Sequence, residues 1–141
     1  MLRNRERLDE KELNLMPPVV LAYIGDGVYE LLSRCYVVKN GPKKIRDIHA
    51  GTVKLVHAHH QAVVLQAVWE SLTEEEQEVV RRGRNVKSHV PRHADPQEYR
   101  YSTGLESLYG YLYLKGEDDR LQEIFRKMME YREKTENPGE E

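Results

Sequence analysis

The stretch "LAYIGDGVYE", residues 21–30, decides the fold, because it reads as part of a helix that holds Asp26 between Gly25 and Gly27. Each glycine in a helix interior costs about 0.8–1 kcal/mol relative to alanine. A second backbone or a ligand that comes close to this surface would compensate for that cost. We therefore expect a close approach around Asp26.

This helix is expected to start at the Pro17-Pro18 pair, to reach about Val38, and to stop at Asn40-Gly41-Pro42. On a helical wheel Asp26 falls opposite the apolar positions. The inward stripe with helical spacing is expected to be Val20, Ile24, Val28, Leu31 and Cys35. The single cysteine, among apolar neighbours, is expected to be a buried structural thiol.

A second stretch, "YRYSTGLESLYGYLYLKG" at residues 99–116, repeats the arrangement with Glu106 and Gly110. Two interpretations are open. Glu106 could form a capping box with Thr103 and only hold an amide. Alternatively, the two helices approach each other closely at their glycines and bring Asp26 and Glu106 together. A divalent cation shared by the two carboxylates would then relieve their repulsion. Oxygen ligands without a cysteine favour Mg²⁺ or Mn²⁺.

The remaining chain predicts an all-α fold. Helices are expected over 43–50 and 52–72, with a strand left open for the second, and from the capping box of Thr73 and Glu76 to about Gly83. Residues 84–98 read as a long loop. The last helix carries a clean apolar stripe of Leu121, Ile124, Phe125, Met128 and Met129.

The 141 residues suit one domain, expected at 13–130 between an arm at 1–12 and a disordered acidic tail at 131–141. No apolar run approaches the ~20 residues of a membrane span, and the N-terminus does not read as a secretory signal. A cytoplasmic location is therefore expected.

The net charge of −2 hides a basic middle, because residues 39–60 and 81–101 each carry four more bases than acids. All six histidines lie within these limits. The cluster of His57, His59 and His60 could suggest a zinc site, but only His57 and His60 share a helix face and no third ligand has a fixed spacing. Contact with RNA or plain surface is favoured for them.

Residues 21–30 resemble the signature helix of the ribonuclease III class, and "YRYSTGLESLYGYLYL", residues 99–114, resembles its second acidic helix. The segment between, 73–103, is similar to the compact one-domain branch called Mini-III ribonuclease. The resemblance covers roughly residues 13–130. It implies a helical homodimer that cuts both strands of duplex RNA, with Asp26 and Glu106 as catalytic, Mg²⁺-binding carboxylates.

The resemblance also implies staggered cuts with 5′-phosphate and 3′-hydroxyl ends, and action on precursor 23S ribosomal RNA, with a ribosomal protein as a possible helper. Larger relatives carry further acids where this chain has Val19, Ala22 and Thr103, so one or two metals are possible. Their duplex-RNA-binding module is not expected after residue 130. Glu30 could serve as an outer metal ligand, but a pair with Arg34 is favoured.

The segment "RRGRNVKSH", residues 81–89, is the expected grip on RNA. Phosphates of the RNA are expected to be neutralised by Arg81, Arg82, Arg84 and Lys87, and 2′-hydroxyl groups to be contacted by Asn85 and Ser88. The basic surface along the RNA backbone is expected to continue to Lys43 and Lys44. The apolar side of the first long helix, at Tyr23 and Ile24, is the candidate dimer contact.

Two rival functions stay open. A non-catalytic RNA-binding protein of the same fold, associated with ribosomes, would not need both acids. An all-α nucleotide pyrophosphohydrolase would place several acids at one-turn spacings on two helices, which this chain lacks.

Overall fold

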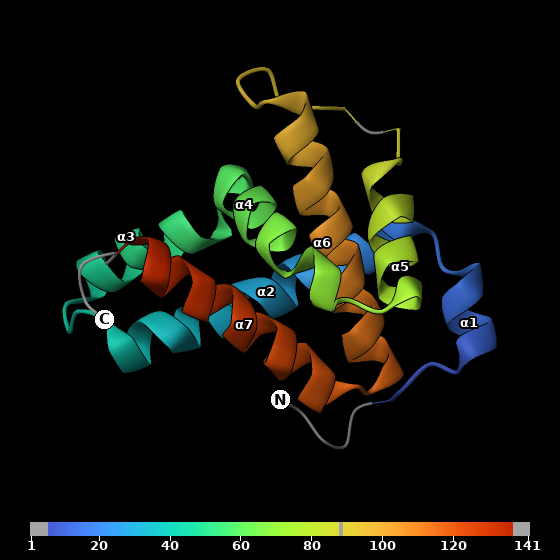
Figure 1. The fold of residues 1–141 in the computed structure, drawn as a ribbon, viewed down its shortest axis with the longest axis horizontal. Coiled ribbons are helices and arrows are strands. Elements are labelled where there is room, and N and C mark those ends of the chain that lie inside the picture. Colours follow the sequence, from blue (N-terminus) through green and yellow to red (C-terminus); the bar gives the residue numbers. More distant parts are fainter. Residues whose placement is uncertain (1–5, 88, 137–141) are drawn as a thin grey trace.

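The computed structural model describes residues 6–87 and 89–136, and over this part of the chain it contains helices and no strand (Figure 1). This confirms the all-α prediction. None of the described helices is long and apolar enough to cross a membrane. The elements are α1 (Glu10–Leu15), α2 (Pro18–Asn40), α3 (Ile45–Val56), α4 (Ala58–Val68), the 3₁₀ turn η1 (Trp69–Ser71), α5 (Glu74–Arg84), α6 (Pro96–Lys115) and α7 (Asp118–Glu136).

Helix α6 is the centre of the fold, and it packs against α2, α4, α5 and α7 (Figure 1). Its ends follow local rules. Asp95 accepts hydrogen bonds from the backbone N–H groups of Gln97 and Glu98, and Pro96 occupies the first turn. Gly116 closes the helix with a φ of 86°, in the left-handed region that glycine adopts without strain.

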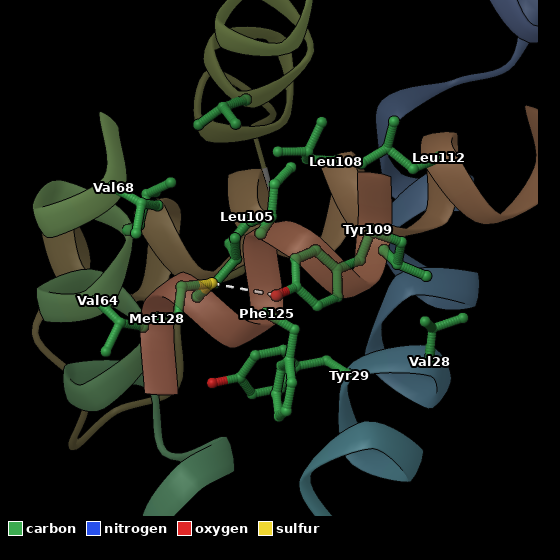
Figure 2. Packing of buried hydrophobic residues seen from close by; sticks show 14 of the residues in the cluster. Val28, Tyr29, Val64, Val68, Leu105, Leu108, Tyr109, Leu112, Phe125 and Met128 are labelled. Carbon is green, nitrogen blue, oxygen red and sulfur yellow. Dashed lines mark hydrogen bonds between the residues drawn. The ribbon is translucent and has the colours of Figure 1, made fainter. Parts of the chain in front are cut away.

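The core lies where α2, α6 and α7 meet (Figure 2). The ring of Tyr29 lies 5.3 Å from that of Tyr109 and 6.0 Å from that of Phe125, centroid to centroid. The Tyr109 hydroxyl donates to the Met128 sulfur at 3.1 Å (Figure 2). The predicted apolar stripe of the last helix is confirmed, because all five of its residues are buried.

The inward face of α2 differs from the expected one. Val20, Leu31 and Cys35 are exposed, so the cysteine is no buried structural thiol. The helix has apolar residues on nearly every side, and periodicity alone therefore does not choose a face. The buried positions include Leu21, Ala22, Gly25, Val28, Tyr29, Ser33 and Val37.

The predicted helices 43–50 and 52–72 have different boundaries, and no strand forms there. Helix α3 continues to Val56, and the chain then breaks at His57, whose backbone is extended. The His57 side chain accepts a hydrogen bond from the backbone N–H of His59 at 3.2 Å and so caps α4. The boundary between the two helices therefore lies at His57 and not at Gly51, and the second helix ends at Val68, before the 3₁₀ turn η1.

The connection between α5 and α6 is shorter than the predicted loop of 84–98. The capping box of Thr73 and Glu76 is confirmed by reciprocal hydrogen bonds of 2.9 and 3.1 Å. Helix α5 ends at Arg84, and α6 already starts at Pro96.

Both ends of the described chain are more ordered than the sequence predicts. Helix α1 begins at Glu10, inside the expected arm of 1–12, and the backbone N–H of Leu8 donates to the Leu114 carbonyl. Helix α7 runs to Glu136, so residues 131–136 do not form the expected disordered tail. The rest of that tail, 137–141, lies outside the described residues.

Candidate active site

The backbones of α2 and α6 touch at two glycines. A Cβ atom on Gly25 would lie 1.6 Å from the carbonyl oxygen of Glu106, and one on Gly110 would lie 1.9 Å from that of Leu21. Neither neighbour can move aside, since both are helix backbone. The expected close approach is confirmed for Gly25 and Gly110. It is wrong for Gly27, around whose added Cβ nothing lies within 4 Å.

This contact brings the two predicted carboxylates into one electrostatic environment. Burial, and next the negative charge of Asp26, raise the pKa of Glu106 to about 7, while a hydrogen bond from Gln61 opposes the rise. Burial, and then the charge of Glu30, also raise the pKa of Asp26. Both carboxyl groups are therefore harder to ionise than free ones, Glu106 much more so than Asp26, which is exposed.

The capping-box interpretation of Glu106 is wrong. Thr103 lies well inside α6, and its hydroxyl donates to the Tyr99 carbonyl at 3.1 Å. The helix start that such a box would serve is at Asp95 instead. Glu106 is thus left without a capping role.

Glu30 has the partner that the sequence favours. Its carboxylate accepts from Arg34 at 3.1 Å, one turn further along α2. It still contributes to the site through its charge, which acts on Asp26.

Gln61 is a site residue that the sequence analysis missed. Its Nε2 donates to the carbonyl of Val56 at 2.7 Å and to Oε1 of Glu106 at 3.3 Å. The residue is only 2% exposed. A usable signal exists in the sequence, because Gln61 is an amide on the same helix face as the buried Leu65 and Val68.

The acids of the site are few. Among residues 6–87 and 89–136, no three histidine, cysteine or acidic side chains are placed to hold a metal together. This speaks against the zinc hypothesis, in line with His59 pairing with Glu98 and His57 capping α4. It leaves a pair of carboxylates, which is sufficient for Mg²⁺, an ion that usually keeps several waters and takes one or two protein carboxylates.

Residues 84–87 of the basic segment border a hollow of about 920 Å³ between the end of α5 and the start of α6. The Arg84 guanidinium lies over the Tyr101 ring, 5.8 Å from its centroid. Arg81 lies over Trp69 and pairs with Glu78, whereas Arg82 is exposed. The hollow is lined by Arg84, Asn85, Val86, Lys87, Asp95, Pro96, Gln97, Arg100 and Tyr101.

Arg100 and Tyr101 come from α6 and were not among the predicted contacts, since they fall beyond the loop in the sequence. Ser88, a predicted contact, lies outside the described residues. Lys43 and Lys44 are exposed in the connection between α2 and α3. That connection lies at the left of Figure 1, far from the α5–α6 connection at the top. The two basic stretches are therefore separate patches of one chain.

The two residues of the predicted dimer contact differ in their exposure. The side chain of Tyr23 is 80% exposed, whereas Ile24 packs partly against the core of its own chain. Tyr23 belongs to an exposed apolar surface, which we call the outer face of α2. It consists of Val20, Tyr23, Leu31 and Val38, each at least 40% exposed, with Gly27 between them.

Comparison with known proteins shows to which family the chain belongs. The family model of the ribonuclease III domain matches residues 19–117. The chain belongs to the ribonuclease III family. Both Asp26 and Glu106 lie within the matched residues.

Curated relatives identify the branch of this family. The chain is 44% identical over 120 residues to the Mini-ribonuclease 3 of Symbiobacterium thermophilum, a match that covers 84% of this chain and 92% of the relative. It is 41% identical over 138 residues to that of Clostridium tetani, covering 96% and 91%. A crystal structure of a Fusobacterium nucleatum protein superimposes with a TM-score of 0.76 at 25% identity, covering 86% and 98%. The family resemblance inferred from the sequence is confirmed.

Proposed function

We propose that Asp26 and Glu106 hold the divalent cation with which this protein, a double-strand-specific endoribonuclease by its family, cleaves RNA. The observation that carries the proposal is the α2–α6 contact at Gly25 and Gly110, which joins the two carboxyl groups electrostatically. Both are costly to ionise alone, and a bound cation would offset that cost.

The donor set fits Mg²⁺, with Mn²⁺ as a substitute, because it offers hard oxygen atoms and no thiolate. Such an ion supplies a Lewis acid that activates water and polarises a phosphodiester. The protein's own part is to hold the two carboxylates near each other on two helices that are in backbone contact. Products with 5′-phosphate and 3′-hydroxyl ends are proposed from the family resemblance.

For substrate binding, we propose that the hollow between α5 and α6 takes the RNA backbone. Arg84, Lys87 and Arg100 line it and can neutralise phosphates, while Asn85 can meet a 2′-hydroxyl group. Arg81, Arg82 and Ser88 extend the same segment. Lys43 and Lys44, on their separate patch, are proposed to meet a more distant part of a long duplex.

Cutting both strands requires two sites, and we propose a homodimer that joins through the outer face of α2. Val20, Tyr23 and Leu31 would lose water contact in such a dimer, and the edge of Ile24 beside them would do so too. Gly27, with open space around it, would let the second copy come close.

The proposed substrate is precursor 23S ribosomal RNA in the cytoplasm, with a ribosomal protein as a possible helper. This rests on the similarity to the Mini-III branch. The catalytic unit is proposed to span residues 13–130, a range that includes the family match of 19–117.

One assay tests the proposed site. The wild type, Asp26→Asn and Glu106→Gln are incubated with long duplex RNA, single-stranded RNA and nucleoside triphosphates, with Mg²⁺ or with a chelator. We expect only duplex RNA to be cut, only with Mg²⁺, and both variants to bind duplex without cutting it. A wild type that binds but never cuts would instead favour the non-catalytic RNA-binding function, and cleavage by Asp26→Asn would remove the carboxylate pair from the mechanism.

The RNA grip is tested by Arg82→Ala and Arg84→Ala, with Arg126→Ala on α7 as the matched control. Each of the first two is expected to weaken duplex binding and to reduce the slope of log affinity against log salt by about one. Arg126 pairs with Glu130 on its own helix, far from the basic segment in the sequence, so its loss should change neither quantity. Equal affinities for all three variants would contradict the proposed surface.

A further inference from the structure

We propose that Gln61 is a positioning residue of the carboxylate site, which fixes Glu106 through one end of its amide and accepts a hydrogen bond from the hydration shell of a divalent cation through the other. This inference rests on the proposed function, because it assumes a cation between Asp26 and Glu106.

The amide of Gln61 is anchored before it reaches Glu106. Helix α3 ends at Val56, and the last carbonyls of a helix lack partners within it. Gln61 donates to the Val56 carbonyl at 2.7 Å, which is a short and therefore well-formed hydrogen bond. The backbone N–H of Gln61 also donates to the His57 carbonyl at 3.0 Å. The side chain thus spans a helix break whose geometry holds it in place.

The second hydrogen of the same amide reaches Oε1 of Glu106 at 3.3 Å. A primary amide has two donor hydrogens, and here both face acceptors. The orientation of the amide follows, because the reverse arrangement would place Oε1 of Gln61 against two other acceptors. Through Gln61, the junction of α3 and α4 holds a carboxylate on α6.

The oxygen of this amide accepts no hydrogen bond from the described residues. Oε1 of Gln61 is buried and has no hydrogen-bond partner there, although the residue is only 2% exposed. A buried acceptor without a donor has lost its hydration without compensation, which destabilises the folded protein. The atom belongs to an amide that already touches Glu106, so a donor that satisfies it would stand beside the carboxylate.

A hydrated cation supplies such a donor. Mg²⁺ keeps several of its waters when only one or two carboxylates bind it, and those waters are strong donors. A water held at Oε1 by protein atoms alone would satisfy this oxygen equally, but the binding of that water would not depend on Asp26. The two explanations therefore differ in whether Gln61 and the cation affect each other.

The test measures Mn²⁺ affinity directly, by the loss of the free-ion electron paramagnetic resonance signal, in the full chain without RNA. Gln61→Met keeps the length and volume of the side chain and removes the amide. Gln61→Asn keeps the amide but withdraws it by one methylene, and it replaces the first variant if that one does not fold. The matched control is Gln77→Met, because Gln77 also donates from Nε2 to a main-chain carbonyl, that of Trp69 at 3.0 Å, away from the carboxylates.

We expect Gln61→Met to weaken Mn²⁺ binding by about tenfold or more, the usual size for loss of a group that orients a metal ligand. It should also shrink the rise in melting temperature that Mn²⁺ produces. Gln77→Met should leave both unchanged. A Gln61→Met protein that melts lower without metal but keeps the wild-type Mn²⁺ affinity would overturn the proposal and leave Gln61 a structural role.

Asp26→Asn separates this inference from the function on which it rests. If Asp26→Asn abolishes Mn²⁺ binding while Gln61→Met leaves it intact, only the role of Gln61 fails. If Asp26→Asn binds Mn²⁺ as the wild type does, the carboxylate site itself fails, and the role of Gln61 fails with it.

Discussion

The two glycines that flank Asp26 look alike in the sequence and differ completely in the fold. Gly25 faces α6, where an added Cβ atom would lie 1.6 Å from a backbone oxygen. Gly27 faces away, and its added Cβ would meet nothing within 4 Å. The first glycine lets two helices touch, and the second lies in the exposed outer face of α2.

Helix α2 therefore contributes to two surfaces, the contact with α6 and the outer face of α2, and Asp26 lies between them. On the Gly25 side, backbone contact joins Asp26 to Glu106. On the Gly27 side, exposed apolar side chains have no cover within a single described chain. Four sets of substitutions test this division.

Gly25→Ala is expected to be the most damaging change. The methyl group would collide with helix backbone that cannot rotate away, so α2 and α6 would have to separate. We expect a loss of at least about 3 kcal/mol in the free energy of unfolding, measured by urea denaturation. Gly110→Ala should behave similarly from the other helix, since its methyl group would meet the Leu21 carbonyl. A mild effect in both variants would mean that the contact is not tight.

Glu106→Gln tests the electrostatic side of the same contact. An isolated glutamate has a pKa of 4.5, and in the folded protein the pKa of Glu106 is about 7. The folded state therefore loses stability as the pH rises from 4.5 to about 7, by about 3 kcal/mol in total.

Without metal, Glu106→Gln should accordingly be more stable than the wild type at about pH 8, and this advantage should vanish below about pH 4.5. Thermal or urea unfolding across this pH range, in a chelator, measures it. Parallel pH profiles for the two proteins would show that Glu106 is not destabilised by its surroundings.

Tyr23→Glu examines the outer face of α2. Tyr23 is 80% exposed, so a charge there should hardly change the stability of one chain, but it should weaken a dimer formed through this face. We expect at least a tenfold weaker association, about 1.4 kcal/mol, by sedimentation velocity. Tyr131→Glu on α7, an exposed tyrosine that is not part of this face, is the matched control. Equal dimerisation of both variants would place the subunit contact elsewhere.

Gly27→Ala should have the smallest effect and the opposite sign to Gly25→Ala. The methyl group has room within one chain, and alanine favours a helix by about 0.8–1 kcal/mol over glycine. We expect the dilute protein to become more stable by up to that amount in urea unfolding. If the variant also dimerises less well, the second copy comes close at Gly27; a loss of stability at low concentration would contradict the open space.

Local sequence signals predicted much of the fold. The capping box at Thr73 and the stripe of the last helix each depend on neighbouring residues alone, and each formed as expected. The candidate pair of Asp26 and Glu106 was also found from glycine spacing, although its role as a metal site stays a proposal.

Other features could not be found this way, because they depend on which distant segments meet. The buried face of α2 is fixed by its contact with α6, and Gly25 adds no hydrophobicity that a periodicity count could detect. The hydrogen bond from Gln61 to Glu106 likewise joins residues that are 45 positions apart and adjacent only in the folded chain.

The sequence by itself thus determined an all-helical chain with two acid-bearing, glycine-containing helices, since helix propensity, caps and stops act over a few residues. Only the tertiary structure decided that Gly25 touches α6 while Gly27 stays open, and that Gln61 reaches Glu106. Those outcomes follow from the packing of whole helices, in which the closest backbone approach, and not local preference, selects the buried face.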